Sequence, residues 1–129
     1  MLSKIILALS AIAPAIATTI FFNADFTQYQ DGPIKAGEQV TIKYDLNRAH
    51  CDHVSYKGYD TFGVFGRYGI NGNFAHEYYL SIAKRNDYNP NVQVVFPEKG
   101  DLAIYFVCGN IEKTTFDSNF SKNFRFTIE

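Results

Sequence analysis

The sequence contains no tryptophan, only one methionine and only two cysteines among its 129 residues. Its acidic and basic residues nearly cancel, so the formal net charge at pH 7 is −1. A near-neutral chain lacks the basic excess that neutralises phosphate backbones, so a nucleic acid partner is not expected. No long apolar run follows residue 17, so we expect a soluble mature chain with no membrane span.

Sequence signatures of enzymes are also missing. There is no phosphate-binding loop, no dinucleotide-binding fingerprint and no Gly-x-Ser-x-Gly turn around a nucleophile. Hydrolysis by paired carboxylates needs two acids facing each other across a cleft. The candidate acids instead fall on outward strand positions or in loops: Asp25, Asp45, Asp60 and Asp87. We therefore predict a protein that is not an enzyme and uses no cofactor.

The densest group of metal-binding residue types is His50-Cys51-Asp52-His53. Two histidines and a carboxylate could hold zinc. However, their spacing matches no closed zinc site, and Cys51 is better used in a disulfide. We therefore expect a solvated loop here and no metal site.

The N-terminal segment has the three parts of a secretory signal peptide. Met1-Leu-Ser-Lys4 is short and basic, an apolar run follows, and Ala15-Ile16-Ala17 fits the small-residue cleavage motif. A membrane anchor is the alternative, but the apolar run is shorter than the roughly 20 residues that cross a bilayer, and Pro14 interrupts it. We expect removal of residues 1–17, which leaves a secreted, extracellular domain of residues 18–129.

Secretion would place both cysteines in an oxidising compartment, where thiols usually pair. We therefore predict a disulfide between Cys51 and Cys108. Two free buried thiols and a shared metal ion are the alternatives. The metal ion is disfavoured because neither cysteine has a second cysteine nearby at metal-ligand spacing.

The most apolar stretch of the later chain runs from Asp101 to Cys108. One alternating face carries Leu102, Ile104, Phe106 and Cys108, and the other carries Ala103, Tyr105 and Val107. A strand that is apolar on both faces is covered on both, or lies centrally in a packed sheet. The turn residues Gly100 and Gly109 bracket the stretch and mark its two ends. We therefore predict a central strand between them.

The remaining chain alternates short strand patterns with turn residues. Strands are expected at residues 20–26, 40–46, 61–68, 76–84, 92–96 and 124–128, and irregular or polar connections at 47–60, 85–91 and 111–121. In the first strand, Ile20, Phe22 and Phe26 are expected on one face. About seven strands with turn signals at short intervals indicate an all-β fold, a single-domain antiparallel β-sandwich with one disulfide.

Three stretches of the chain belong together by their order and spacing: Phe22–Phe26, Gly32–Asp45 and Phe116–Phe126. One cysteine follows the second stretch, and the other precedes the third. In these features the chain resembles a family of small secreted microbial β-sandwich proteins of unknown function. The resemblance covers most of the mature chain and implies secretion, the sandwich and the disulfide. It implies no catalytic residues.

The middle of the chain is rich in tyrosine interleaved with basic residues. Tyrosine offers a flat apolar face and a hydroxyl, which suit sugar rings and protein interfaces. Because binding usually involves the loops at the ends of a sandwich, we predict ligand contact at Tyr56, Tyr59 and Tyr88, with Arg85 as a polar partner. The alternative is that these rings pack in the core, as we expect for Tyr78.

Together these patterns favour a secreted, monomeric, non-catalytic binding module for a glycan or for a host or competitor protein. A toxin or effector that perturbs membranes is the alternative, although no amphipathic helix is present. A small hydrolase is disfavoured because no catalytic set converges. Asn119-Phe-Ser121 is an N-glycosylation sequon, which carries a glycan only in a eukaryotic source and only if its loop does not pack tightly.

Overall fold

The computed structural model describes residues 17–48, 51–82, 87–88 and 91–129, with the backbone alone for residues 74–82 and 87–88. The regular structure in these residues is β-strand apart from one 3₁₀ turn, η1 (Leu46–Arg48). The prediction of an all-β fold is therefore confirmed. Residues 1–16 of the expected signal peptide lie outside the described residues.

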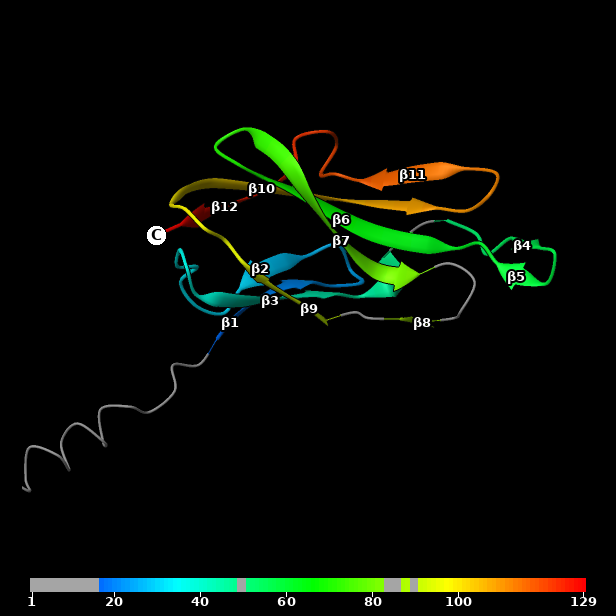
Figure 1. Cartoon of the computed structure of the whole chain (residues 1–129), viewed down its shortest axis with the longest axis horizontal. Coiled ribbons are helices and arrows are strands. Elements are labelled where there is room, and N and C mark those ends of the chain that lie inside the picture. The colour runs from blue at the N-terminus through cyan, green and yellow to red at the C-terminus, as the bar shows by residue number, and fades with distance from the viewer. Residues whose placement is uncertain (1–16, 49–50, 83–86, 89–90) are drawn as a thin grey trace, which may run out of the picture.

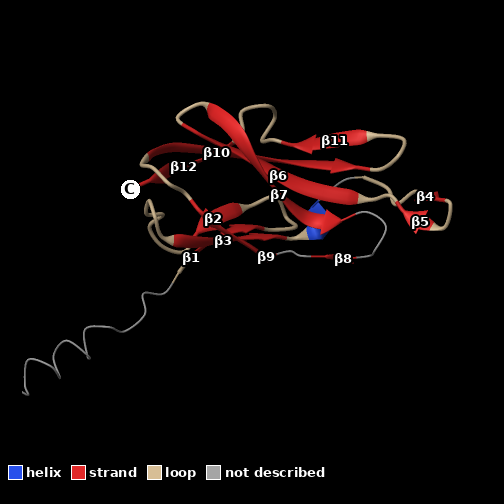
Figure 2. Ribbon diagram, in the orientation of Figure 1, coloured by secondary structure: helices blue, strands red, loops and turns tan. Residues whose placement is uncertain are grey.

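Two sheets form the two layers of a sandwich (Figures 1 and 2). The smaller sheet has the order β2-β1-β3-β9, with β1 Thr18–Phe22, β2 Gln28–Gln30, β3 Gln39–Tyr44 and β9 Asn91–Val95. The larger has the order β11-β10-β6-β7-β8, with β6 Gly63–Ile70, β7 Asn73–Ile82, β8 Asp87–Tyr88, β10 Gly100–Gly109 and β11 Thr114–Asp117. A further strand, β12 (Phe124–Ile128), also pairs with β10. The hairpin of β4 (Ser55–Tyr56) and β5 (Tyr59–Asp60) extends from one end of the sandwich (Figure 1).

The hydrophobic core lies between the two layers. The inward positions of β1 and β3 are buried, as predicted for the alternating residues 40–44. Phe22 of β1 contacts Phe106 and Phe124 of the opposite sheet edge-on, with ring centroids 4.7 and 5.3 Å apart. Such edge-to-face pairs add to the stabilisation that burial itself supplies. Aromatic packing therefore joins the sheets near the end of β1.

Strand β10 is the central strand that its sequence predicts. It pairs with β6 on one side and with β11 and β12 on the other. Residues on both of its faces are buried, including Ile104 and Phe106 on one face and Ala103 and Val107 on the other. The predicted disulfide is also present: Cys51 is bonded to Cys108 of β10, with their Cα atoms 6.1 Å apart. It attaches the segment before the β4–β5 hairpin to the larger sheet.

The first strand is shorter than its sequence predicts. It ends at Phe22, and the chain turns back through a bend in which the Asn23 N–H donates to the Thr27 carbonyl at 2.9 Å. The Asp25 carboxylate accepts the Thr27 N–H at 3.1 Å, so turn chemistry overrides the alternation of apolar residues. Phe26 takes a positive φ of 65° and is exposed, so its predicted place on the buried face was wrong.

The antiparallel prediction fails for one pair of strands. β1 pairs with β3 in parallel, whereas the other pairs of named strands are antiparallel. After β2 the chain crosses toward the other sheet, where Ile34 bridges to Ile128. It then returns on the far side of β1, running in the same direction as that strand.

Several short strands occupy segments predicted to be irregular. The hairpin β4–β5 lies within residues 47–60, β8 within 85–91 and β11 within 111–121. Strands of two to four residues are too short to establish an alternating pattern, so only pairing with a neighbour defines them. Of these, β11 matters most here, because it forms an edge of the larger sheet.

One side of the sandwich is closed and the other is open. β7 of the larger sheet contacts β9, the edge of the smaller sheet, on the closed side. The opposite edges are β2 and β11, each paired with a single strand. A pocket lined by Gln28 of β2 and by Phe116 and Asp117 of β11 lies between these edges. We call this the open side, and the polar side chains of the next section lie there.

Candidate ligand-binding site

A buried arginine lies at the open side of the sandwich. Arg48 is only 1% exposed and ends the 3₁₀ turn that follows β3. The turn forms because Asp45 accepts hydrogen bonds from two backbone N–H groups, through its side chain from Asn47 and through its carbonyl from Arg48. Burying a guanidinium costs several kcal/mol unless the charge is paired and its donors are satisfied.

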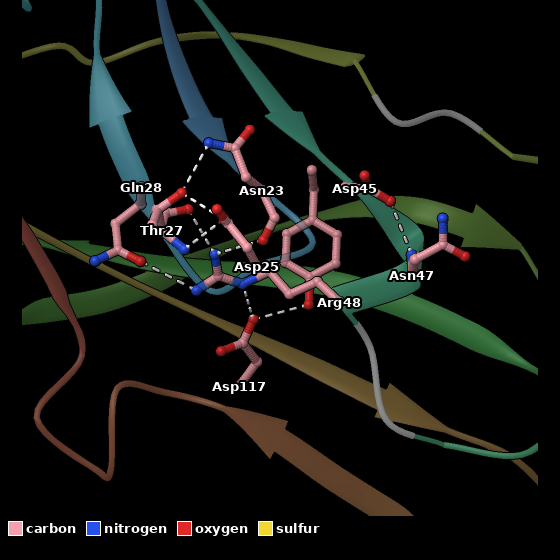
Figure 3. Close-up of polar contacts among 9 residues, drawn as sticks. Asn23, Asp25, Thr27, Gln28, Asp45, Asn47, Arg48 and Asp117 are labelled. Atoms are coloured by element: carbon pink, nitrogen blue, oxygen red, sulfur yellow. Dashed lines mark hydrogen bonds and ion pairs between the residues drawn. The ribbon is translucent and has the colours of Figure 1, made fainter.

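Both requirements are met by partners from three segments of the chain (Figure 3). The Arg48 Nε donates to the Asp117 carboxylate of β11 at 2.6 Å, and Asp117 also accepts the Tyr44 hydroxyl at 2.8 Å. The Arg48 Nη1 donates to the carbonyls of Asn23 and Thr27 at 3.2 and 3.0 Å. Nη2 donates to the side-chain oxygen of Gln28 at 3.2 Å. Arg48 therefore links the edge of one sheet to the edge of the other.

Aromatic rings surround the same guanidinium. Its central carbon lies 4.9 to 5.9 Å from four ring centroids, those of Phe22, Phe26, Tyr44 and Phe124. Cation–π attraction is stronger in such a desolvated setting than at an exposed site. We call Arg48, Asp117 and these four rings the Arg48 cluster.

A pocket of about 420 Å³ opens to solvent above the Arg48 cluster. Arg48 and Asp117 line its interior, and Phe26, Phe116 and Phe120 contribute exposed rings. We call this the aromatic pocket. Polar side chains also line it: Gln28, Ser118, Asn119 and Ser121. Its lining thus combines aromatic rings with polar and charged groups, and a concave surface of this mixed kind can bind a small molecule.

The three phenylalanines of the aromatic pocket are unusually exposed for apolar side chains. Phe26 is 49% exposed, Phe116 63% and Phe120 96%. A scattered exposed apolar residue has no special meaning, but a contiguous group marks an interaction surface. Because all three rings line one pocket, they form such a group.

The backbone around the pocket is held in a costly conformation. Asn119, Phe120, Ser121 and Asn123 all have positive φ, between 51° and 68°. Left-handed backbone costs a non-glycine residue about 1 kcal/mol or more, and such residues gather at binding sites. The loop is held by bonds across its base, including Asn123 N–H to the Ser118 carbonyl at 2.7 Å. These bonds hold the backbone that carries Phe120.

The tyrosines predicted to bind ligand lie elsewhere. Tyr56 and Tyr59 face each other in the β4–β5 hairpin, both about half exposed, and neither lines the aromatic pocket. The amine of Lys57 lies 5.3 Å from the Tyr56 ring centroid. Only the backbone of Tyr88 is described, and Arg85 lies outside the described residues. Ligand contact at these four residues stays a prediction.

Two further sequence predictions also stay open. Tyr78 pairs with Gly66 across β6 and β7, but its side chain lies outside the described residues, so its predicted core role is not tested. Asn119 of the sequon lies in the exposed loop between β11 and β12, and its side-chain amide donates to the Asn123 carbonyl at 3.1 Å. Its glycosylation remains a prediction.

His53 pairs with Asp60 at the base of the β4–β5 hairpin. The His53 Nδ1 lies 2.6 Å from the Asp60 Oδ2, and the Phe62 N–H donates to the other Asp60 oxygen at 2.9 Å. Burial acts to raise the pKa of the Asp60 carboxyl, but the bonds from Phe62 and His53 outweigh it and hold the pKa below the usual 3.8. The His53 ring also stacks on Phe62, with centroids 4.1 Å apart.

This pairing predicts an acid-sensitive contribution to stability. As the pH falls below the ordinary aspartate value, the unfolded chain takes up a proton at Asp60 before the folded protein does. The contribution of Asp60 is therefore complete above about pH 4 and is lost as the pH falls through the folded pKa. We expect Asp60→Asn to lose less stability than the wild type between about pH 6 and about pH 3 in thermal melts. Asp52→Asn, in the same segment, is the control, and equal acid sensitivity of wild type and Asp60→Asn would contradict the assignment.

The segment with the densest group of metal-binding residue types, where we expected no metal site, contains other bonds. Cys51 is in the disulfide and His53 pairs with Asp60, while His50 lies outside the described residues. Within the part of the chain that the structure describes, no group of three or more histidine, cysteine, aspartate or glutamate residues is placed to hold a metal ion.

The sequence assigned none of the residues that line the aromatic pocket to ligand binding, although it singled out Asn119-Phe-Ser121 as a glycosylation sequon. One available signal was the grouping of Phe22–Phe26 with Phe116–Phe126, two of the three stretches that carry the family resemblance. The structure brings these stretches together at the pocket, through Phe26 on one side and Phe116 and Phe120 on the other.

None of the described segments forms a helix long and apolar enough to cross a membrane. The family described as "Family of unknown function (DUF6209)" matches residues 15–129 of the chain. No curated protein and no solved structure is significantly similar to the chain.

Proposed function

The chain belongs to this family of unknown function, and from its geometry we propose that it is a secreted, non-catalytic module that binds a glycan in the aromatic pocket. One observation carries the proposal: three exposed phenylalanines, Phe26, Phe116 and Phe120, surround a pocket whose interior is polar and charged. The disulfide between Cys51 and Cys108 and the N-terminal signal pattern support secretion.

A sugar ring matches this pocket in both its faces and its edges. Its C–H face is apolar and packs against an aromatic ring, whereas its hydroxyls need hydrogen-bond partners. Phe116 and Phe120 offer the rings, and the amides of Gln28 and Asn119 offer donors and acceptors. Oδ2 of Asp117 already accepts two bonds, while Oδ1 makes none within the described residues. That oxygen is suited to accept a sugar hydroxyl.

The same pocket supports binding rather than hydrolysis. Glycosidases generally use two carboxyl groups about 5 to 9.5 Å apart, on either side of the scissile bond. Among the described residues Asp117 is the one carboxylate that lines the aromatic pocket. Its bond to Arg48 gives it a structural role as well.

A second candidate partner is a membrane surface. The observation in its favour is Phe120, which is 96% exposed in its loop and could enter the interfacial region of a bilayer. Ser118, Asn119 and Ser121 would have to enter with it, and their polar groups favour a sugar instead. Sedimentation with lipid vesicles separates the two candidates.

The glycan proposal is tested by binding of the secreted protein to an oligosaccharide array, followed by calorimetry on the best ligand. Phe116→Ala and Phe120→Ala are each expected to weaken binding about tenfold or more, as truncation of an interfacial aromatic anchor does. Phe120→Ala should leave the melting temperature unchanged, because the ring is almost fully exposed.

Tyr59→Ala is the matched control, since Tyr59 is also exposed but lies on the β4–β5 hairpin. We expect this variant to bind like the wild type. If Tyr59→Ala loses affinity and Phe120→Ala does not, the hairpin is the binding site and the pocket is not. Binding to vesicles with no oligosaccharide bound would favour the membrane candidate and overturn the glycan proposal.

A further inference from the structure

The aromatic pocket continues as a groove along the open side of the sandwich. A second hollow of about 550 Å³ shares Gln28, Asn119 and Phe124 with the aromatic pocket, so the two adjoin. It extends toward β12, where Lys122 and Arg125 line it. A ligand longer than a single sugar could therefore occupy both hollows.

The two ends of this groove differ in charge. At the aromatic end, the charges of Asp117 and Arg48 compensate each other. At the other end, Lys122 and Arg125 are exposed, and no acidic residue is among the described residues that line it. Neither cation forms an ion pair within the described part of the chain. This end therefore carries uncompensated positive charge.

The position of Arg125 is partly fixed by the pocket loop. Its Nε donates to the Lys122 carbonyl at 3.3 Å, which leaves the terminal nitrogens of the guanidinium for a ligand. A guanidinium binds a carboxylate with two parallel hydrogen bonds, and an ammonium adds a flexible positive charge beside it. The two cations together are suited to a carboxylate group rather than to a neutral hydroxyl.

We propose that the ligand is an acidic oligosaccharide. Its sugar rings pack against Phe116 and Phe120, and a uronate carboxylate further along the chain is bound by Lys122 and Arg125. This inference rests on the proposed function, because it assumes that a glycan occupies the aromatic pocket. It goes further by assigning the glycan's charge and the direction in which it lies along the groove.

The test compares tetragalacturonate with the same tetramer in which every carboxylate is methyl-esterified, a change that removes the charge and adds one methyl group per sugar. By calorimetry, we expect the acid to bind about tenfold more tightly than the ester at low salt, the gain typical of a charge-assisted hydrogen bond. High salt should remove most of this difference, because both cations are exposed.

Variants assign the effect to the two cations. In the double variant Lys122→Gln/Arg125→Gln the acid is expected to lose its advantage, while the ester binds as it does to the wild type. Lys43→Gln, which removes a positive charge from β3 away from this groove, should preserve the difference. Melting temperatures of the variants verify that the pocket loop stays folded.

The outcomes separate this inference from the proposed function. Equal affinity for acid and ester, with Phe120→Ala weakening both, would overturn the acidic ligand and leave the glycan module standing. Failure of both tetramers and of all neutral oligosaccharides to bind would overturn both proposals. A charge preference that survives in Lys122→Gln/Arg125→Gln would overturn the assignment to these two residues.

Discussion

Replacing Arg48 with methionine is expected to lower the free energy of unfolding by about 3 to 5 kcal/mol, the cost of breaking a buried ion pair by removing one partner. The change leaves the Asp117 carboxylate, which is 16% exposed, without its cation. It also removes the donors that satisfy the carbonyls of Asn23 and Thr27 at the β1–β2 turn. Urea denaturation of the wild type and the variant measures the loss.

Two control variants test whether the loss in Arg48→Met comes from the buried ion pair. Arg67→Met removes an exposed arginine that lies over the Phe65 ring, and it should cost far less, within about 1 kcal/mol. The double variant Arg48→Met/Asp117→Leu removes both charges and should recover part of the stability lost in Arg48→Met. If Arg48→Met costs no more than Arg67→Met, the Arg48 cluster does not hold the two sheet edges together.

The second large effect is expected from removing the disulfide. The double variant Cys51→Ala/Cys108→Ala should lose about 4 kcal/mol of unfolding free energy in the chain-entropy model, in which the loss grows with the loop that the bond closes. That loop is long, since the two cysteines are 57 residues apart in the sequence.

Urea denaturation with and without reductant provides the measurement. Reductant should destabilise the wild type by a similar amount and leave the double variant unchanged. A loss below about 1 kcal/mol would show that the bond contributes little to the restriction of the unfolded chain. Because Cys108 is buried in β10, alanine is preferred to serine, which would add an unsatisfied hydroxyl.

The parts of the fold that were predictable are those with long, regular patterns. The stretch from Asp101 to Cys108 is apolar on both faces and bracketed by turn residues, and these features predicted its place at the centre of a sheet. Residues 40–44 alternate cleanly and form β3 with the expected face buried. The disulfide followed from the number of cysteines and the expected compartment.

The alternation of apolar residues gave a wrong prediction where a turn ends the strand. Phe26 keeps the spacing of the buried residues Ile20 and Phe22, yet the side chain of Asp25 bonds to Thr27, so Phe26 lies in the turn itself. The pKa of Asp25 is correspondingly lowered, first by the bond from the Thr27 hydroxyl. A short-range hydrogen bond thus decided the position of a residue that lines the aromatic pocket.

The Arg48 cluster could not be predicted from local sequence for a different reason. Its members come from β1, the β1–β2 turn, β3, η1, β11 and β12, which only the folded chain brings together. In the sequence, Arg48 is one basic residue in a polar segment, where exposure is the usual expectation. The tyrosine-rich segment is recognisable from its composition. The aromatic pocket instead depends on three phenylalanines from two separate stretches of the chain.

Whether the aromatic pocket binds a glycan can be measured by amide chemical-shift mapping with tetragalacturonate. We expect the shifts to gather at residues 26–28 and 116–125 and the β4–β5 hairpin to be unaffected. Shifts confined to the hairpin around Tyr56 and Tyr59, or no shifts at saturating ligand, would contradict this expectation.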